Sequence, residues 1–298
     1  MVGLVTAFLS AAVAIVSVDL KRILAYSTIS HLGLMMLSLG ALGYTAAIFH
    51  LLAHGFAKAL LFLGAGSVMH STDEQDIRKM GGLVKVMPVT AMVFSIGALS
   101  LGGIPILAGF WSKDEILNAV SQHRNPVFIV LTLVVAFMSA FYMARAMFVV
   151  FFGQLRQGLA HAHESPIVMM LPMALLAVLA AGFGLISFNW PGVYIGFGGF
   201  VFFRESEPFH FNWLLGITSI VLALGGFWLA SLCYLRKRIS TDSLQTRIPW
   251  LVGVVENKFY FDESYQWTVD RVVFVISSFI AVFDRAFVND VAVNGPAY

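Results

Sequence analysis

The sequence predicts an all-α polytopic membrane protein with seven transmembrane helices, one of them broken, followed by an amphipathic helix. Three observations predict this class. Of 298 residues, 59% are hydrophobic and only 11% are charged, whereas about a quarter of a soluble domain is charged. The mean hydropathy is +0.86. Apolar runs recur at a length that can cross a bilayer, and the basic residues between them gather in alternate loops.

Seven apolar runs match the roughly 20 residues that cross a hydrocarbon core of about 30 Å. They cover residues 1–18, 23–43, 45–69, 88–118, 126–152, 167–188 and 212–235. The first run has neither a cationic region before it nor a cleavage site after it, so it is interpreted as a span and not as a signal peptide. The fourth run is too long for one straight helix. Its Gly102-Gly103-Ile104-Pro105 segment removes a backbone donor, which predicts a break at the membrane midplane.

The basic residues predict how the spans are oriented. If the helices alternate, nine of these residues lie on one side: Lys21, Arg22, Arg78, Lys79, Lys85, Arg156, Arg236, Lys237 and Arg238. Only Arg124 and Arg204 lie on the other. Because cytoplasmic loops carry the excess of basic residues, the loops at 19–22, 71–87 and 153–166 are predicted in the cytoplasm or an equivalent compartment.

The chain changes character after the seventh run. Residues 240–270 are polar and aromatic, and an apolar run at 271–288 carries Arg271, Asp284 and Arg285. A short run with an ion pair near its end favours an amphipathic helix lying along the membrane surface. An eighth span stays open as the alternative.

Residue usage argues against several classes of function. A net charge of +2 without a basic block gives no support for nucleic acid as a partner. The single cysteine, Cys233, is too few for an iron–sulfur cluster, so no cofactor is expected in this chain. The Gly64-Ala-Gly66 segment lies inside an apolar run and lacks the third glycine of a dinucleotide-binding fingerprint.

Three residues that can carry proton chemistry share one face of the third predicted helix. His50, His54 and Lys58 are four residues apart and turn by only about 40° per step. A lysine at the bilayer centre costs roughly 3 kcal/mol on insertion scales, which indicates a hydrated or protein interior around it. Histidine titrates near neutral pH, so the row is interpreted as a proton relay. Core histidines with a snorkelling lysine are the structural alternative. A zinc site is disfavoured, because Leu51 stands where a zinc protease has its glutamate and no third ligand is nearby.

A second charged group follows the predicted break. Lys113 lies on the second half-helix, with Asp114 and Glu115 beside it. Broken helices place free carbonyls and helix dipoles at the midplane, which is how transporters build ion sites. The alternative is that these residues mark the helix end at the outer surface. Arg145, well within the fifth helix, needs a partner, for which Asp114 or Glu115 is a candidate.

Four segments together resemble one family, the antiporter-like L subunit of respiratory complex I, which is the proton-translocating NADH-quinone oxidoreductase. They are DLKRILAYSTISHLGLMM, AAIFHLLAHGFAKALLFLGAGSVMH, DIRKMGGL and GIPILAGFWSKDEIL, in this order. The resemblance is specific from residue 1 to about 152 and looser beyond. His50, His54, Lys58, Lys113 and Asp114 stand at the family's proton-translocation positions. The family's loop between repeat helices matches the segment with Asp19 and Lys21. The resemblance assigns no functional role to His31, because many members of the family have glutamine at this position.

The resemblance implies a domain organisation. Family members carry two inverted repeats of five helices, each with one broken helix. Residues 1–152 are then one five-helix antiporter-like proton-channel repeat, residues 153–238 are two further transmembrane helices, and residues 239–298 are a cytoplasmic-side segment with the start of a lateral helix. The first repeat and the end of the lateral helix are absent, so both ends are expected to be truncated.

The resemblance also implies a function. The chain is expected to translocate protons within the membrane arm, driven by quinone reduction elsewhere, without a redox centre of its own. The implied partners are other membrane-arm subunits, the lipid bilayer, protons and water, with FMN and iron–sulfur clusters held by partner subunits. The implied location is a bacterial inner membrane or an equivalent energy-coupling membrane. Two alternatives stay open: a subunit of a multisubunit sodium/proton antiporter or membrane-bound hydrogenase, and a non-pumping structural fragment.

Overall fold

The computed structural model describes residues 1–298 except 157, 160, 189–195, 203–211, 240–247 and 294–298. Contacts divide the chain into two units, residues 1–246 and residues 247–298. The described residues are helical, apart from loops and one isolated antiparallel bridge between Asp19 and Asp76. This confirms the all-α class.

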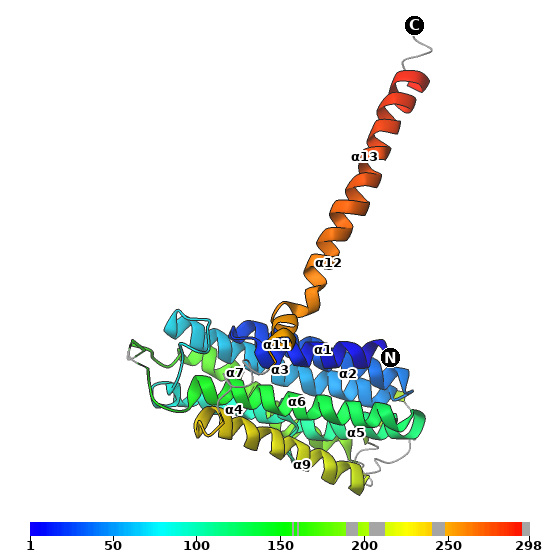
Figure 1. Ribbon diagram of the computed structural model, residues 1–298. Coiled ribbons are helices and arrows are strands. Elements are labelled where there is room, and N and C mark those ends of the chain that lie inside the picture. Colours follow the sequence, from blue (N-terminus) through cyan, green and yellow to red (C-terminus); the bar gives the residue numbers. More distant parts are fainter. Residues whose placement is uncertain (157, 160, 189–195, 203–211, 240–247, 294–298) are drawn as a thin grey trace. The chain divides into compact units, whose positions relative to one another are not determined.

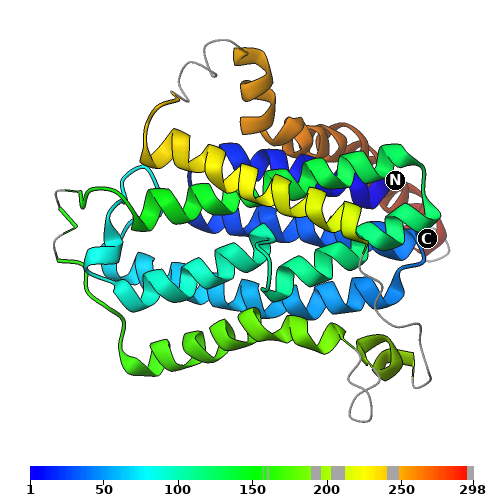
Figure 2. The same cartoon turned by 90° about the horizontal axis from the view of Figure 1, so that it is seen from below.

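The first unit is a bundle of helices that run side by side (Figures 1 and 2). Its long elements are α1 (Val2–Val16), α2 (Leu20–Gly40), α3 (Tyr44–Thr72), α4 (Pro88–Gly102), α5 (Ala108–His123), α6 (Pro126–Phe151), α7 (Ile167–Gly182) and α9 (Trp213–Ala230). Shorter elements are η1 (Leu83–Lys85), η2 (Phe183–Ser187), α8 (Gly196–Phe202) and η3 (Ser231–Leu235).

Small residues let these helices approach closely. At the crossing of α1 and α2, a Cβ added to Gly3 would lie 2.6 Å from the carbonyl oxygen of Gly33. The buried core also contains many alanines, among them Ala11, Ala57 and Ala140. Helices associate in membranes through such small-residue contacts, because lipid supplies no hydrophobic drive between them.

The predicted break in the fourth run is confirmed. Helix α4 ends at Gly102, Gly103 adopts a left-handed conformation with φ of 82°, and α5 begins at Ala108. Proline at 105 cannot donate to the carbonyl of Leu101, so the helical hydrogen-bond ladder cannot continue. The two half-helices follow one another along the bundle with an irregular segment between them (Figure 2).

The count of seven spans is not confirmed. Six helical stretches of the described chain are long and apolar enough to cross a membrane: 20–40, 44–72, 126–151, 167–187, 213–235 and 258–289. The first predicted span is the 15-residue helix α1, and the fourth is the shorter pair α4 and α5. The predicted and observed numbers of spans differ because a helix that packs against longer neighbours in a bundle does not itself need a long apolar stretch.

Loops that were predicted on one side of the membrane meet at one end of the bundle. The amide of Leu20 donates to the carbonyl of Gln75 over 3.0 Å, which joins the α1–α2 turn to the α3–α4 loop. The amide of Gly82 donates to the carbonyl of Phe152 over 3.0 Å, which adds the end of α6. Arg124 follows α5, and Arg204 lies outside the described residues.

The second unit contains α11 (Pro249–Glu256), η4 (Lys258–Tyr260), α12 (Phe261–Thr268), η5 (Val269–Val273), α13 (Phe274–Phe283) and η6 (Asp284–Val293). Residues 258–289 form a nearly continuous helical stretch with the length and hydropathy of a span. The surface helix predicted at 271–288 and its alternative, an eighth span, both stay predictions.

Candidate functional site

The row on α3 is buried inside the first unit. The exposed fraction is 0% for His50, 5% for His54 and 5% for Lys58. The rings of His50 and His54 have centroids 6.1 Å apart, as expected for neighbours one helical turn apart. The burial of Lys58 contradicts the alternative in which this side chain snorkels to an interface.

Lys58 is held by α2. Its Nζ donates to the carbonyl oxygen of Leu24 over 3.0 Å and to the hydroxyl of Ser27. Within the described residues, ion pairs occur only in the loop at 74–79 and between Lys258 and Asp262, so this lysine is buried with neutral partners. A buried ammonium without a counter-ion is energetically costly, and such groups are typical of ion pathways in membranes.

His31 joins the row, which the sequence did not predict. Its Nδ1 lies 2.9 Å from Nε2 of His50, and its ring centroid lies 5.2 Å from those of both His50 and His54. It is fully buried. No role was predicted for His31, and the contact could not be predicted from helical spacing because it crosses from α2 to α3. The one available signal was that His31 lies one helical turn beyond Ser27.

The row continues from α3 to α5. Nδ1 of His50 lies 2.8 Å from Oγ of Ser112, which directly precedes Lys113. A neutral imidazole has one donor and one acceptor nitrogen, so His50 can accept a proton on one side while it releases one on the other. The contacts therefore link His31, His50 and Ser112 into one hydrogen-bonded line through the interior.

Lys113 is positioned by the break. Its Nζ donates to the carbonyl oxygen of Leu101 and, over 2.7 Å, to Oγ of Ser139 on α6. The carbonyl of Leu101 is free because the residue four positions on is Pro105, which has no N–H. With 4% of its surface exposed, Lys113 does not mark a helix end at the surface.

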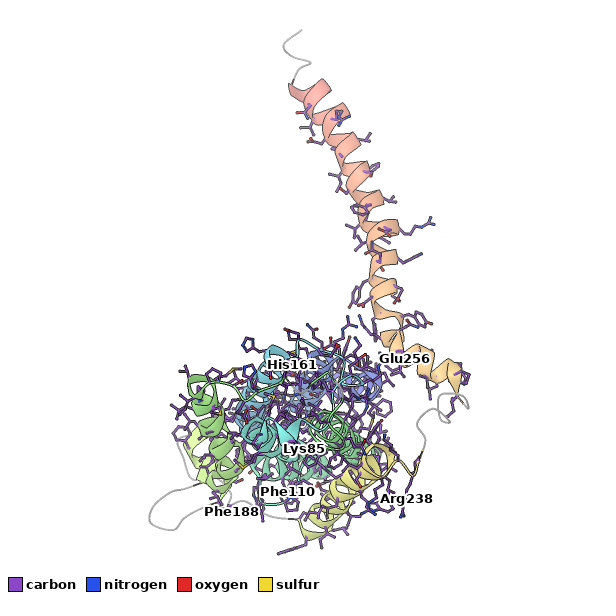
Figure 3. All side chains as sticks on the ribbon, turned by 90° about the vertical axis from the view of Figure 1, so that its left-hand side faces the viewer. Lys85, Phe110, His161, Phe188, Arg238 and Glu256 are labelled. Carbon is purple, nitrogen blue, oxygen red and sulfur yellow. The ribbon has the colours of Figure 1, made fainter. Side chains whose placement is uncertain are left out.

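The two carboxylates beside Lys113 point elsewhere. Asp114 is 1% exposed, and neither of its oxygens has a hydrogen-bond partner among the described residues. Glu115 accepts a hydrogen bond from the hydroxyl of Ser187 over 2.7 Å. The start of α5 is further fixed by aromatic packing, since Trp111 lies edge-on to both Phe110 and Phe188 (both labelled in Figure 3).

The expected partners of Arg145 are not the ones observed. Its Nη1 donates to the carbonyl of Ser17 over 2.6 Å, and its guanidinium lies 5.7 Å from the ring centroid of Tyr234. The expectation of Asp114 or Glu115 was therefore wrong. Arg145 lies in the last third of α6, where the helix reaches the α1–α2 turn. Its side chain therefore contacts residues at that height along the bundle axis, and not Asp114 or Glu115 on α5.

Asp19 and Lys21 belong to this loop end. Asp19 caps α2 by accepting a hydrogen bond from the amide of Arg22 over 2.9 Å. Lys21 is exposed. In the loop that pairs with Asp19, hydrogen bonds from Arg78 hold the pKa of the Asp76 carboxyl below its ordinary value. These residues stabilise a loop junction and do not touch the buried row.

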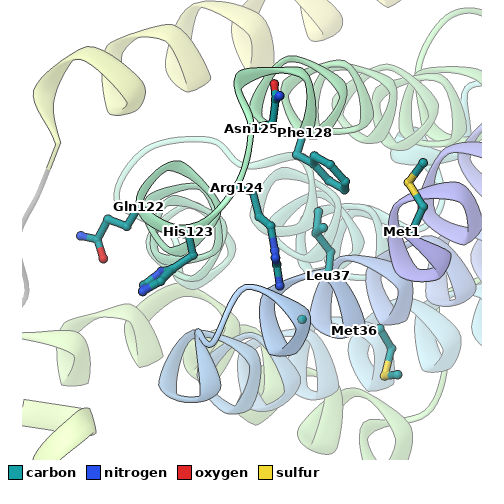
Figure 4. A pocket seen from close by; sticks show the side chains of 9 residues that line it. Met1, Met36, Leu37, Gln122, His123, Arg124, Asn125 and Phe128 are labelled. Atoms are coloured by element: carbon teal, nitrogen blue, oxygen red, sulfur yellow. The ribbon is translucent and has the colours of Figure 1, made fainter.

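Two further features of the described chain concern metal binding and ligand binding. No group of three histidine, cysteine or acidic side chains in the described chain is arranged to hold a metal ion. A hollow of about 580 Å³ lies at the end of the bundle away from the Asp19–Asp76 loop junction, and Met36, Leu37, His123, Arg124 and Phe128 are among the residues that line it (Figure 4). It shares no residue with the row.

The chain is similar to several known proteins. Residues 1–139 match the family described as NADH:quinone oxidoreductase/Mrp antiporter, TM. The chain is 41% identical to NAD(P)H-quinone oxidoreductase chain 5 of Picosynechococcus sp. over 88% of this chain and 45% of that protein. It is 35% identical to NADH-quinone oxidoreductase subunit L of Rickettsia bellii over 99% of this chain and 48% of that protein.

A solved structure supplies the fold. A chain of the Mrp complex from Dietzia sp. matches 98% of this chain and 33% of its own length, with a TM-score of 0.58 and 23% identity. The chain spans somewhat less than half the length of these curated relatives. It is similar over most of its length to the quinone oxidoreductase chain 5 and subunit L proteins, and its residues 1–139 match the NADH:quinone oxidoreductase/Mrp antiporter family.

Proposed function

We propose that this chain translocates protons as a membrane-arm part of an NADH-quinone oxidoreductase, driven by quinone reduction in other subunits. The observation that carries the proposal is the buried row of His50, His54 and Lys58, which a hydrogen bond between His50 and Ser112 links to the neighbouring buried Lys113. Two lysines that form no ion pair with a described carboxylate, and the histidines next to them in the row, are groups that can bind, pass and release protons. The names of the relatives support the same assignment.

The proposal assigns the remaining parts. Residues 1–152 are the five-helix proton-channel repeat, 153–238 are two further membrane helices, and 239–298 begin a helix along neighbouring subunits. The partners are other membrane-arm subunits, and FMN and iron–sulfur clusters belong to further subunits of the assembly. The location is a bacterial inner membrane or an equivalent energy-coupling membrane, with the basic loop end in the cytoplasm.

A sodium/proton antiporter subunit is the second candidate. The likeness to a chain of an Mrp complex favours it, but at 23% identity this likeness concerns the fold alone. The relatives at 35–41% identity are named as quinone oxidoreductase subunits, which makes that function the stronger proposal.

The test uses the assembly purified from native membranes and reconstituted in vesicles. We expect NADH-dependent quinone reduction to drive acidification, and Lys58→Ala to abolish that acidification while the chain still assembles. Lys85→Ala is the matched control, because Lys85 is an exposed lysine of the loop end. Wild-type pumping by assembled Lys58→Ala would refute the role of the row. Sodium-dependent proton exchange without NADH oxidation would instead support the antiporter.

A further inference from the structure

The two buried lysines have matching surroundings built from different helices. Lys58 donates to the hydroxyl of Ser27 and to the carbonyl of Leu24, both on α2. Lys113 donates to Ser139 on α6 and to the carbonyl of Leu101 on α4. Each ammonium therefore has one serine hydroxyl and one backbone carbonyl as partners.

Each serine is held so that its oxygen lone pairs are available to the lysine. The hydroxyl of Ser27 donates to the carbonyl of Leu24 over 2.9 Å, and that of Ser139 donates to the carbonyl of Ala136 over 2.7 Å. Both acceptor carbonyls lie one turn back in the same helix, so each hydroxyl can donate its hydrogen bond to that carbonyl while its oxygen accepts one from the ammonium. The pairs differ in one respect: the carbonyl of Leu24 accepts from both Ser27 and Lys58, whereas Ser139 and Lys113 donate to separate carbonyls, those of Ala136 and Leu101.

A serine differs from the other partners in what it can do after the lysine loses its proton. A neutral amine has a lone pair that needs a donor. A hydroxyl can rotate and donate to it, whereas a carbonyl or a carboxylate can only accept. A carboxylate would also form a strong charge-assisted pair that favours the ammonium. Within the described chain neither lysine has an ion-pair partner.

We propose that Ser27 and Ser139 are positioning residues that satisfy Lys58 and Lys113 in both protonation states. The inference rests on the proposed proton translocation. In the charged state the ammonium donates to the serine oxygen. When an N–H bond of the ammonium breaks, the proton passes to a neighbouring base, a histidine ring or a water, and the electron pair stays on Nζ. The serine hydroxyl then turns from its carbonyl to donate to that pair, and the motion reverses when the lysine is protonated again.

The test measures NADH-driven acidification by vesicles that contain the assembled complex, normalised to the amount of this chain. Ser27→Ala and Ser139→Ala should each slow acidification about fivefold, the factor that corresponds to one lost hydrogen bond of ordinary strength. Ser27→Thr and Ser139→Thr keep the hydroxyl and should pump near the wild-type rate. This rescue separates a hydroxyl requirement from a loss of packing.

A second pair tests the donor capacity itself. Asparagine and aspartate have the same size, but the amide can donate and accept while the carboxylate can only accept. Ser27→Asn should therefore pump faster than Ser27→Asp. Ser30→Ala on α2 and Thr132→Val on α6 are matched controls, since these hydroxyls bond the backbone carbonyls of Ala7 and Phe128.

The outcomes separate the two proposals. Alanine variants that assemble and pump like the threonine variants, or asparagine and aspartate variants that pump equally, would overturn the role of the serines. If Lys58→Ala, measured in parallel, stops acidification, then only the inference fails. If Lys58→Ala also pumps normally, the proposed function fails with it.

Discussion

Helix α5 lies so close to the end of α4 that a single methyl group at Gly109 should separate them. A Cβ added to Gly109 would lie 1.9 Å from the carbonyl oxygen and 2.6 Å from the carbonyl carbon of Ser100. Both atoms belong to the backbone, so they cannot turn aside. Because an ordinary contact needs about 3.4 Å, Gly109→Ala should push the half-helices apart by about 1.5 Å at this point.

Two hydrogen bonds would not survive that shift. The amide of Gly109 donates to Oγ of Ser100 over 3.1 Å, and one turn further along α5 Lys113 donates to the carbonyl of Leu101. A neutral hydrogen bond contributes about 1 kcal/mol and one from a charged group about 1.5–3 kcal/mol. We therefore expect Gly109→Ala to lower the free energy of unfolding by roughly 2–4 kcal/mol, or the melting temperature by about 5–15 °C.

The assay is thermal unfolding of the chain in detergent, followed by its helical circular dichroism. Gly55→Ala is the matched control: it adds the same methyl group to helix α3, where nothing lies within 4 Å of the new Cβ. Alanine in a helix is favoured over glycine by up to about 1 kcal/mol, so this control should melt at or slightly above the wild type. Equal melting temperatures for both variants would refute the close contact. Acidification by the assembled complex should fall with Gly109→Ala, because Lys113 loses its carbonyl partner.

Three further predictions concern the ends and the interior of the bundle. Hydrogen bonds from Arg78 hold the pKa of Asp76 below its ordinary value of 3.8, so this carboxylate stabilises its loop above that pH and ceases to do so as the pH falls through the lowered pKa. Amide hydrogen exchange of residues 73–80, corrected for intrinsic rates, should therefore rise only under acidic conditions. The Asp76→Asn variant should show the same rise at neutral pH. Arg145→Met should lower the free energy of unfolding by about 1–3 kcal/mol, since the carbonyl of Ser17 loses its donor; an unchanged melting temperature would contradict this contact. His31→Leu should cost a similar amount, roughly 1–3 kcal/mol, because it leaves a buried ring nitrogen on α3 unpaired, whereas His31→Gln, which keeps a hydrogen-bonding group, should melt closer to the wild type.

Several features of the fold follow from local chemistry and could be predicted. The break between α4 and α5 depends on Gly102, Gly103 and Pro105, whose effect on the backbone needs no distant partner. The shared face of His50, His54 and Lys58 follows from the helical repeat, and their burial follows from the cost of placing a charge in lipid.

The count of spans could not be predicted as reliably. Run length identifies a span only when the helix crosses alone and straight, and the short helices α1 and α4 pack against longer neighbours. The partner of Arg145 was misassigned for a related reason. A charge indicates that a partner is needed, but not which level of which helix supplies it.

The sequence by itself determined the membrane class, the break and the one-sided row of histidines and lysine, because each depends on composition or on spacing within a single helix. Only the tertiary structure decided that Ser27 and Ser139 hold the lysines and that His31 contacts His50. The contact partners are far apart in the chain: the separation is 31 positions for Ser27 and Lys58, 26 for Lys113 and Ser139, and 19 for His31 and His50. They depend on how each helix is rotated and shifted against its neighbours, and that register is set by the packing of small side chains over the whole bundle and not by any periodicity within one helix.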